Sequence, residues 1–224
     1  SLPFEAQPGE KFVYGYNTDI LGALTEVVSG QPLNTFLKNY ILDPLDMKDT
    51  HFYLPENKKE RLTVVYSSTE NGLERAADPG GMIGQGAYVN GPRMSFSGGA
   101  GYLSTALDYA NFLQMMLNDG VFNGKRLISS KTVELMTVNH LGEVTFPYIN
   151  GTGFGLGFYT VNDVGSRGLL GSKGEYGWGG AYHSTYWVDP EENLVVVYFT
   201  QLRPVNGLDD HGKLRALVYQ AIID

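Results

Sequence analysis

Residues 174–201 constrain the fold more than any other part of this sequence, because they predict two strands joined by a turn over Asp189-Pro190. Residues 181–188 are rich in Tyr, Thr, Trp and Val, which suit the pleated, half-buried surface of a sheet. Residues 194–200 are almost wholly apolar and β-branched, which is typical of a strand covered on both faces. The segment therefore predicts a strand, a turn and a second strand.

The tripeptide Trp178-Gly179-Gly180 stands at the head of the first predicted strand. Paired glycines leave backbone bare where another group can approach closely, and bare N–H groups beside an aromatic wall are the components of an oxyanion-binding site. The alternative is a simple strand entry with a packed tryptophan. In a regular strand His183 lies on the opposite face from Trp178, which favours a hydrogen-bonded structural histidine.

Periodicity and capping residues predict helices over most of the first half of the chain. They are expected at residues 17–29, capped by Asn17 or Thr18, at 33–43, at 106–117 after Ser104 or Thr105, and at 130–138. Residues 45–95 are expected to be irregular, residues 153–158 alternate as one strand, and residues 214–222 form a closing helix. This order indicates an α+β fold, with a mostly helical region over 1–145 and a strand-rich region over 146–224.

Composition excludes several classes of function. The net charge is −8 with Lys and Arg scattered along the chain, so we expect no nucleic-acid partner. No apolar run approaches the roughly 18 residues that a membrane-spanning helix needs. The chain has no Cys, and His51, His140 and His211 have no partners at metal-ligand spacing, so we expect neither a metal site nor a cofactor.

Tyr14 is a candidate acid or base just before the first predicted helix. A tyrosine takes that role when a neighbouring cation lowers its pKa from about 10. The alternative is an aromatic anchor that packs beside Phe12, and from the residues alone this alternative has the greater weight.

Four segments, at residues 8–22, 36–52, 97–120 and 177–190, together resemble the serine β-lactamase and penicillin-binding-protein superfamily. Their sequences are PGEKFVYGYNTDILG, FLKNYILDPLDMKDTHF, SGGAGYLSTALDYANFLQMMLNDG and GWGGAYHSTYWVDP. The likeness is to the class C-like branch, which includes esterases of β-lactamase fold, and it covers nearly the whole chain. It implies an antiparallel sheet with a C-terminal helix packed on it, and a bacterial parent that is periplasmic or secreted.

By this resemblance Tyr14 matches the catalytic tyrosine, and Trp178-Gly179-Gly180 takes the place of the Lys-Thr-Gly motif. Ala181 would then lend its backbone N–H to the oxyanion hole. Tyr16 replaces the Asn of the Tyr-x-Asn motif, so Tyr16 and Trp178-Gly179-Gly180 are the expected substrate-binding residues. A tryptophan supplies no positive charge for a substrate carboxylate, which favours a neutral ester over a β-lactam or D-Ala-D-Ala peptide.

The Ser-x-x-Lys motif of this superfamily, which carries its nucleophile, occurs nowhere in the sequence. We therefore expect the C-terminal part of a serine hydrolase whose nucleophile helix and first strands are missing, and which is inactive alone. Its expected partners are a small ester or amide, and either the missing N-terminal segment or a second copy. The alternatives are a β-lactamase-like or D-Ala-D-Ala carboxypeptidase-like parent and a non-catalytic binding or scaffold module.

Overall fold

The computed structural model describes residues 3–78, 84–86, 88–89 and 91–223. Its helices are α1 (Asn17–Ser29), α2 (Leu33–Leu37), η1 (Lys38–Leu42), η2 (Glu56–Arg61), α3 (Ala106–Leu117), α4 (Ser130–Met136), α5 (Val164–Arg167) and α6 (Asp210–Gln220). Its strands are β1 (Tyr66–Thr69), β2 (Gly72–Arg75), β3 (Val121–Phe122), β4 (Lys125–Arg126), β5 (Thr152–Phe154), β6 (Tyr159–Val161), β7 (Tyr176–Gly179), β8 (Thr185–Asp189) and β9 (Leu194–Tyr198).

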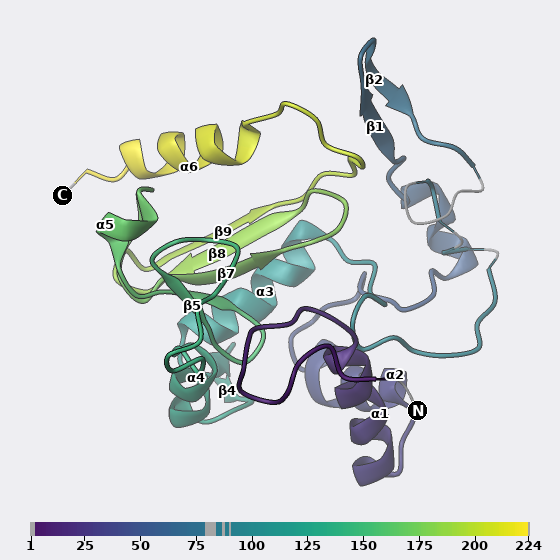
Figure 1. Ribbon diagram of the computed structural model, residues 1–224. Coiled ribbons are helices and arrows are strands. Elements are labelled where there is room, and N and C mark those ends of the chain that lie inside the picture. Colours follow the sequence, from purple (N-terminus) through teal and green to yellow (C-terminus); the bar gives the residue numbers. More distant parts are fainter. Residues whose placement is uncertain (1–2, 79–83, 87, 90, 224) are drawn as a thin grey trace.

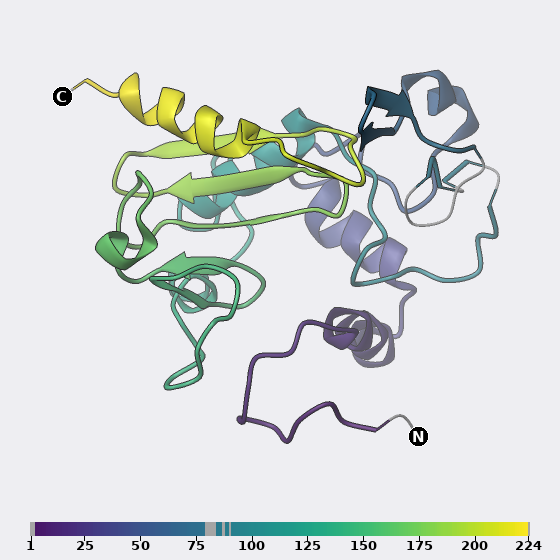
Figure 2. The same cartoon turned by 45° about the horizontal axis from the view of Figure 1, so that its top comes forward.

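A five-stranded antiparallel sheet of order β5-β6-β7-β8-β9 forms the middle layer of the molecule. Helix α6 lies along one face of this sheet and α3 along the other (Figures 1 and 2). Successive side chains of β8 point to opposite faces of the sheet. Tyr186 and Val188 belong to the core on the α3 side, whereas the centroid of the Trp187 ring lies 4.2 Å from the Arg215 guanidinium of α6. The α+β prediction, with a C-terminal helix on the sheet, is confirmed.

Two helices begin where their capping residues place them. Thr105 accepts a hydrogen bond from the Asp108 N–H at 3.1 Å, so α3 starts at the predicted cap. Ser129 caps α4 in the same way. The predicted bounds of α1 are confirmed, but its predicted cap is wrong, because its N-cap is Tyr16, which makes no side-chain capping bond, and Asn17 is already helical.

The predicted strand over residues 181–188 is confirmed only from Thr185 onward, because a turn takes up its first residues. Strand β7 ends at Gly179, residues 180–184 turn, and β8 begins at Thr185. His183 has a positive φ of 63°, so it cannot lie in a regular strand. Trp178-Gly179-Gly180 therefore closes a strand instead of opening one. Gly179 fits there because a Cβ would lie 2.9 Å from the Ser184 carbonyl oxygen.

Two other segments differ from the sequence predictions. Residues 153–158 form the β5–β6 hairpin instead of one strand, with Gly157 at a φ of 103° in the connection. The described parts of residues 45–95 contain η2 and the β1–β2 hairpin, which projects from the body of the molecule (Figure 1). The division of the chain at residue 145 stays a prediction.

Strand β9 forms the outer edge of the main sheet among the described residues. All five of its residues are partly exposed, so the prediction of a strand covered on both faces is wrong. Beyond β9 the chain continues along the β1 hairpin: Tyr66 N–H donates to Gln201 O at 2.8 Å, and Arg203 N–H donates to Tyr66 O at 2.8 Å. In the part of the chain that the structure describes, no helix has the length and apolar character that crossing a membrane requires.

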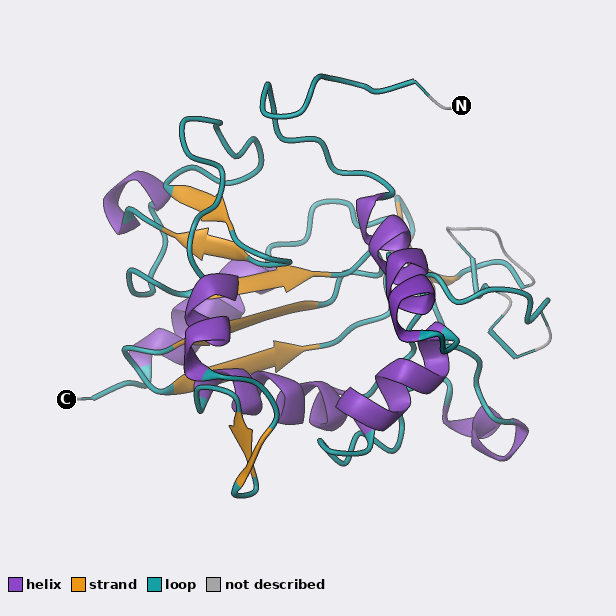
Figure 3. Cartoon of the chain, turned by 90° about the horizontal axis from the view of Figure 1, so that it is seen from below, coloured by secondary structure: helices purple, strands orange, loops and turns teal. Residues whose placement is uncertain are grey.

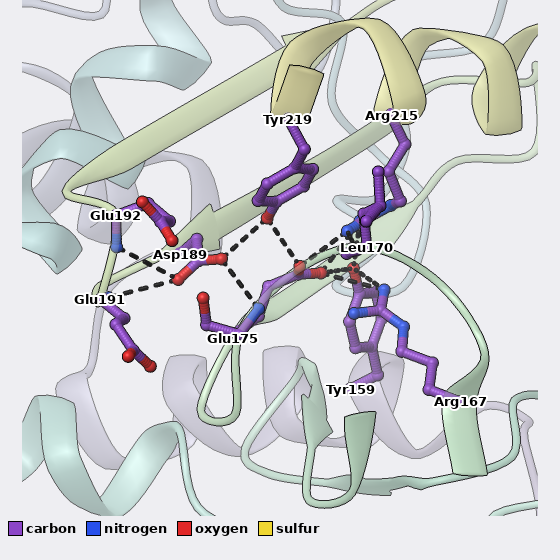
Figure 4. Close-up of polar contacts among 10 residues, drawn as sticks. Tyr159, Arg167, Leu170, Glu175, Asp189, Glu191, Glu192, Arg215 and Tyr219 are labelled. Carbon is purple, nitrogen blue, oxygen red and sulfur yellow. Dashed lines mark hydrogen bonds and ion pairs between the residues drawn. The ribbon is translucent and has the colours of Figure 1, made fainter. Parts of the chain in front are cut away.

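A buried ion cluster joins α5 and α6 to the start of β7 (Figure 4). Glu175, which is 0% exposed, accepts hydrogen bonds from Arg215 at 2.7 and 2.9 Å and from Arg167 at 3.0 Å. Tyr159 and Tyr219 also donate to this carboxylate, at 2.9 and 3.0 Å. Without the Glu175 carboxylate both arginines would lack a counter-charge in a low-dielectric interior. The cluster therefore depends on Glu175.

We predict that Glu175→Gln lowers the free energy of unfolding by about 3–5 kcal/mol, the usual cost of removing one partner from a buried ion pair. The measurement is urea unfolding followed by circular dichroism. Glu134→Gln is the matched control, because Glu134 pairs with Lys131 on an exposed surface and should cost less than about 1 kcal/mol. Equal losses in the two variants would contradict the assignment.

The same variant should change how stability depends on pH. Burial raises the pKa of Glu175, but hydrogen bonds from Arg215 and Arg167 outweigh it and hold that pKa below its ordinary value of 4.5. A lowered pKa contributes stability that is fully present above the unfolded-state pKa and is lost as pH falls through the folded-state pKa. Below pH 4.5 the free energy of unfolding of the wild type should therefore fall more steeply with decreasing pH than that of Glu175→Gln.

Candidate active site

Tyr14 stacks on Trp178, although the two residues come from opposite ends of the chain. Their ring centroids are 5.7 Å apart with an interplanar angle of 26°. By sequence Tyr14 precedes α1, whose N-terminal side is a long loop (Figure 3), whereas Trp178 lies near the end of β7. The Tyr14 side chain is 60% exposed, and its hydroxyl has no hydrogen-bond partner among the described residues. The phenol is thus held over Trp178 with its hydroxyl free.

Trp178 is fixed by an aromatic cluster that we define as Phe12, Phe146, Tyr148 and Phe154. The Trp178 ring meets Phe154 edge-on at 5.2 Å and lies 6.2 Å from Phe146. Phe12 packs against Phe146 and Phe154 at 5.0 Å each. Phe12, rather than Tyr14, therefore anchors the N-terminal loop to the sheet.

The turn after β7 aims one backbone amide outward. The Gly180 carbonyl oxygen accepts a hydrogen bond from His183 N–H at 3.2 Å, which holds that oxygen inside the turn. The peptide bond between Gly180 and Ala181 is trans, so the Ala181 N–H points in the opposite direction. Within the described chain this N–H has no acceptor. A free, fixed amide donor of this kind is suited to a developing oxyanion.

The carbonyl oxygens of Ala181, Tyr182 and His183 accept hydrogen bonds from residues 200–203. Arg203 Nη1 donates to Ala181 O at 3.2 Å, and Leu202 N–H donates to Tyr182 O at 3.1 Å. Thr200 Oγ1 donates to His183 O at 2.7 Å. The peptide planes of residues 180–183 are consequently restrained. Arg203 also places a guanidinium beside Trp178-Gly179-Gly180, and no sequence pattern indicated this cation.

The remaining predicted site residue, Tyr16, lies apart from this arrangement. It is 80% exposed at the N-cap of α1 and makes no aromatic contact with the described residues. The structure thus brings Tyr14, Trp178, Gly179, Gly180 and Ala181 to one end of β7, and leaves Tyr16 outside. Their catalytic and substrate-binding roles stay predictions.

The structure also contains a cluster of His183, Asp210 and His211 that the spacing of these residues in the sequence did not predict. The potential ligand atoms of these three side chains lie within 4.8 Å of one another. However, the two imidazole rings are stacked 3.8 Å apart at an angle of 9°, and the ring lone pairs lie in the planes of the rings. Lone pairs in two parallel planes do not converge on one ion, so this arrangement is hydrogen-bonded rather than a ready chelate.

Two hollows of the described chain lie away from Tyr14 and Trp178. One of about 500 Å³ is bordered by Thr160, Asn162 and Lys173, and the other of about 390 Å³ by Lys38, His51 and Tyr102. Neither is lined by Ala181. Because Tyr14 and Ala181 are both exposed, the groups gathered at the end of β7 form an open wall.

Comparison with known proteins matches a family model described as Beta-lactamase over residues 1–220. Lovastatin esterase of Penicillium rubens is 31% identical over 231 aligned positions, which cover 92% of this chain and 55% of that protein. A D-alanyl-D-alanine carboxypeptidase-like protein of Escherichia coli K12 is 29% identical, with coverages of 94% and 49%. The structure of EstCE1, a hydrolase with promiscuous acyltransferase activity, superimposes with a TM-score of 0.78 at 25% identity, over 96% of this chain and 57% of that one. The chain spans about half the length of the curated relatives it matches.

We predict that Tyr14→Ala lowers the free energy of unfolding by less than about 1 kcal/mol, because an exposed side chain away from the core contributes little. Phe12→Ala is the comparison variant and should cost about 2–4 kcal/mol, since it removes a ring packed in the aromatic cluster. The measurement is the free energy of unfolding of both variants in urea, compared with that of the wild type. If Tyr14→Ala costs as much as Phe12→Ala, Tyr14 is a structural anchor.

Proposed function

This chain belongs to the beta-lactamase family of hydrolases, and from that premise we propose that it supplies the proton-transfer and oxyanion-binding part of a serine esterase. The observation that carries the proposal is the stacking of Tyr14 on Trp178, which places a free phenol beside the turn that bears the free Ala181 amide. Two groups needed at one reacting carbonyl, a proton carrier and an oxyanion donor, thus share one end of β7.

The serine nucleophile comes from a segment outside this sequence. Two observations support this part of the proposal: no Ser-x-x-Lys occurs in the chain, and the chain matches only about half of its curated relatives. The partly exposed edge of β9 would accept a strand of that segment or of a second copy, since an unpaired edge presents free N–H and C=O groups.

In the proposed reaction the serine oxygen attacks the ester carbonyl carbon, and the bond to the alcohol oxygen breaks after a tetrahedral intermediate. The Ala181 N–H donates to the intermediate's oxyanion. Tyr14 accepts the serine proton and passes a proton to the departing alkoxide. Water then attacks the acyl-serine, and its proton returns to the serine oxygen by the same route, so that a carboxylic acid and the free enzyme are released.

An ester is favoured over an amide by the residues around the turn. Trp178 and the aromatic cluster present an apolar wall, which suits an uncharged acyl group. Tyr16, exposed at the N-cap of α1, carries a phenol where the family has the side-chain amide of an asparagine. The relationship to lovastatin esterase supports the same substrate class.

We predict that this chain alone forms no covalent adduct with p-nitrophenyl butyrate, whereas the full-length protein acylates at a serine outside this sequence. Intact-mass spectrometry followed by peptide mapping measures both. In the full-length protein Tyr14→Phe should lower kcat by about 10²–10⁴-fold, the usual contribution of a positioned acid or base. A stoichiometric adduct on this chain alone, or a Tyr14→Phe enzyme of normal kcat, would contradict the proposal.

Arg203 favours a second candidate function, that of a carboxypeptidase acting on peptides with a free carboxylate. Its guanidinium bonds the Ala181 carbonyl and lies 5.9 Å from the centroid of the Tyr182 ring, so the turn carries a cation although Trp178 supplies none. Arginine is well suited to bind a carboxylate through two parallel hydrogen bonds. The similarity to a carboxypeptidase-like protein supports this candidate.

Arg203→Gln separates the two candidates in the full-length protein. Loss of the Arg203 bond to Ala181 O should lower kcat/KM for every substrate alike, so the two substrates are compared with each other. For the esterase we expect kcat/KM for p-nitrophenyl butyrate and for a diacetyl-Lys-D-Ala-D-Ala peptide to fall by factors within about threefold of each other, because no substrate carboxylate is paired with Arg203. For the carboxypeptidase we expect the value for the peptide to fall more than about tenfold further than the value for the ester. Wild-type hydrolysis of the peptide faster than of the ester would reverse our order of preference.

A further inference from the structure

His183 occupies a strained position in the turn that carries the Ala181 amide. Its φ of 63° lies in the left-handed region, where a residue with a bulky side chain is uncommon and glycine or asparagine is usual. The strain has a structural consequence, because in this conformation the His183 N–H reaches the Gly180 carbonyl oxygen at 3.2 Å. The conformation of His183 thereby sets the direction of the peptide unit whose other end is the Ala181 N–H.

The side chain of His183 contacts α6, which follows it in the chain. Its Nε2 lies 2.7 Å from Asp210 Oδ1, at the first turn of α6. Its ring stacks on His211 at 3.8 Å, and the His211 Nε2 lies 3.2 Å from the His183 carbonyl oxygen. Tyr198 of β9 donates to the other carboxylate oxygen of Asp210 at 3.1 Å. The side chain is therefore bonded to α6 on its edge and covered by α6 on its face.

The charges of this cluster agree with a hydrogen-bonded bridge. Burial raises the pKa of Asp210, but hydrogen bonds from His183 and Tyr198 outweigh it and leave that pKa lowered, so Asp210 is an anion at neutral pH. Burial, followed by the nearby His183, lowers the pKa of His211, which favours its neutral form there. The His183 Nε2–H consequently has an anionic acceptor, which makes a stronger hydrogen bond than a neutral one.

We propose that His183 is a positioning residue for the oxyanion amide: its bridge to Asp210 fastens the β7–β8 turn to α6 and keeps the Ala181 N–H aimed at the reacting carbonyl. The role of that amide rests on the proposed function, whereas the mechanical role of the bridge does not. Removing the bridge should loosen residues 180–184 while the rest of the sheet stays in place, since β7 and β8 remain paired from Tyr176 to Gly179.

The first test measures the mobility of the Ala181 amide in this chain by ¹⁵N relaxation. In the wild type its order parameter should be about 0.85, the value of rigid backbone. In His183→Asn, which tolerates a positive φ but is too short to reach Asp210, we expect a value below about 0.6. His183→Gln, whose amide N–H has a reach similar to that of imidazole Nε2, should restore most of the rigidity.

His140→Asn is the matched control, because it makes the same substitution at a histidine whose Nε2 bonds the Leu135 carbonyl oxygen, outside the turn. It should leave the Ala181 order parameter unchanged. A rigid Ala181 amide in His183→Asn would overturn the proposal, as would equal loosening in His183→Gln and His183→Asn. Zn²⁺ added to the wild type is a further arm: an Ala181 amide that becomes rigid only with Zn²⁺ would replace the bridge by a metal site.

The second test uses the full-length protein and p-nitrophenyl butyrate. An oxyanion contact acts in the transition state and not in the bound ester, so His183→Asn should lower kcat about tenfold or more with KM changed less than about twofold. A loss confined to KM would overturn the link to the oxyanion. If the wild-type protein has no esterase activity, the proposed function fails, and the order parameters still decide whether His183 holds the turn.

Discussion

The fold depends on the balance of charge around Glu175. A carboxylate with no exposure is tolerated only because Arg215 and Arg167 neutralise it and two tyrosine hydroxyls complete its hydrogen bonds. Such a cluster adds less net stability than an apolar core of equal volume, but it accepts only one arrangement of its donors. Because Arg215 belongs to α6, this one arrangement fixes where the C-terminal helix lies on the sheet (Figure 4).

Helix α6 holds both ends of β7. Its second half meets the start of β7 and the end of β8, through Arg215 on Glu175 and Tyr219 on Asp189 at 2.8 Å. Its first turn meets the β7–β8 turn, through Asp210 on His183. The strand that carries Trp178 is thus clamped lengthwise on one face, while α3 supports the sheet from the other face. The position of the free amide is therefore a consequence of how a distant helix is docked.

Sequence reasoning was most successful where local patterns determine structure. The length of α1, the Thr105 cap of α3 and the terminal helix all follow from side-chain period and capping chemistry within a few residues. The β7–β8 turn was missed because its partners, Thr200, Arg203 and Asp210, lie 17 to 27 residues further along the chain. For the same reason no local pattern could have revealed the His183 cluster or the cation at Ala181. The nearness of Tyr14 to Trp178 was implied by family resemblance, and no spacing rule predicts it.

The open wall at the end of β7 explains why this chain carries recognisable motifs without forming a closed pocket. Tyr14 is held by stacking rather than by a hydrogen bond, so its hydroxyl stays available to a partner group. The Ala181 amide is fixed through the carbonyls behind it, so it needs no acceptor in front to keep its direction. A site prepared from behind in this way meets the condition for electrostatic preorganisation, in which the donors are in place before the charge develops. In the proposed reaction such a site still requires a nucleophile and an opposing wall that excludes water.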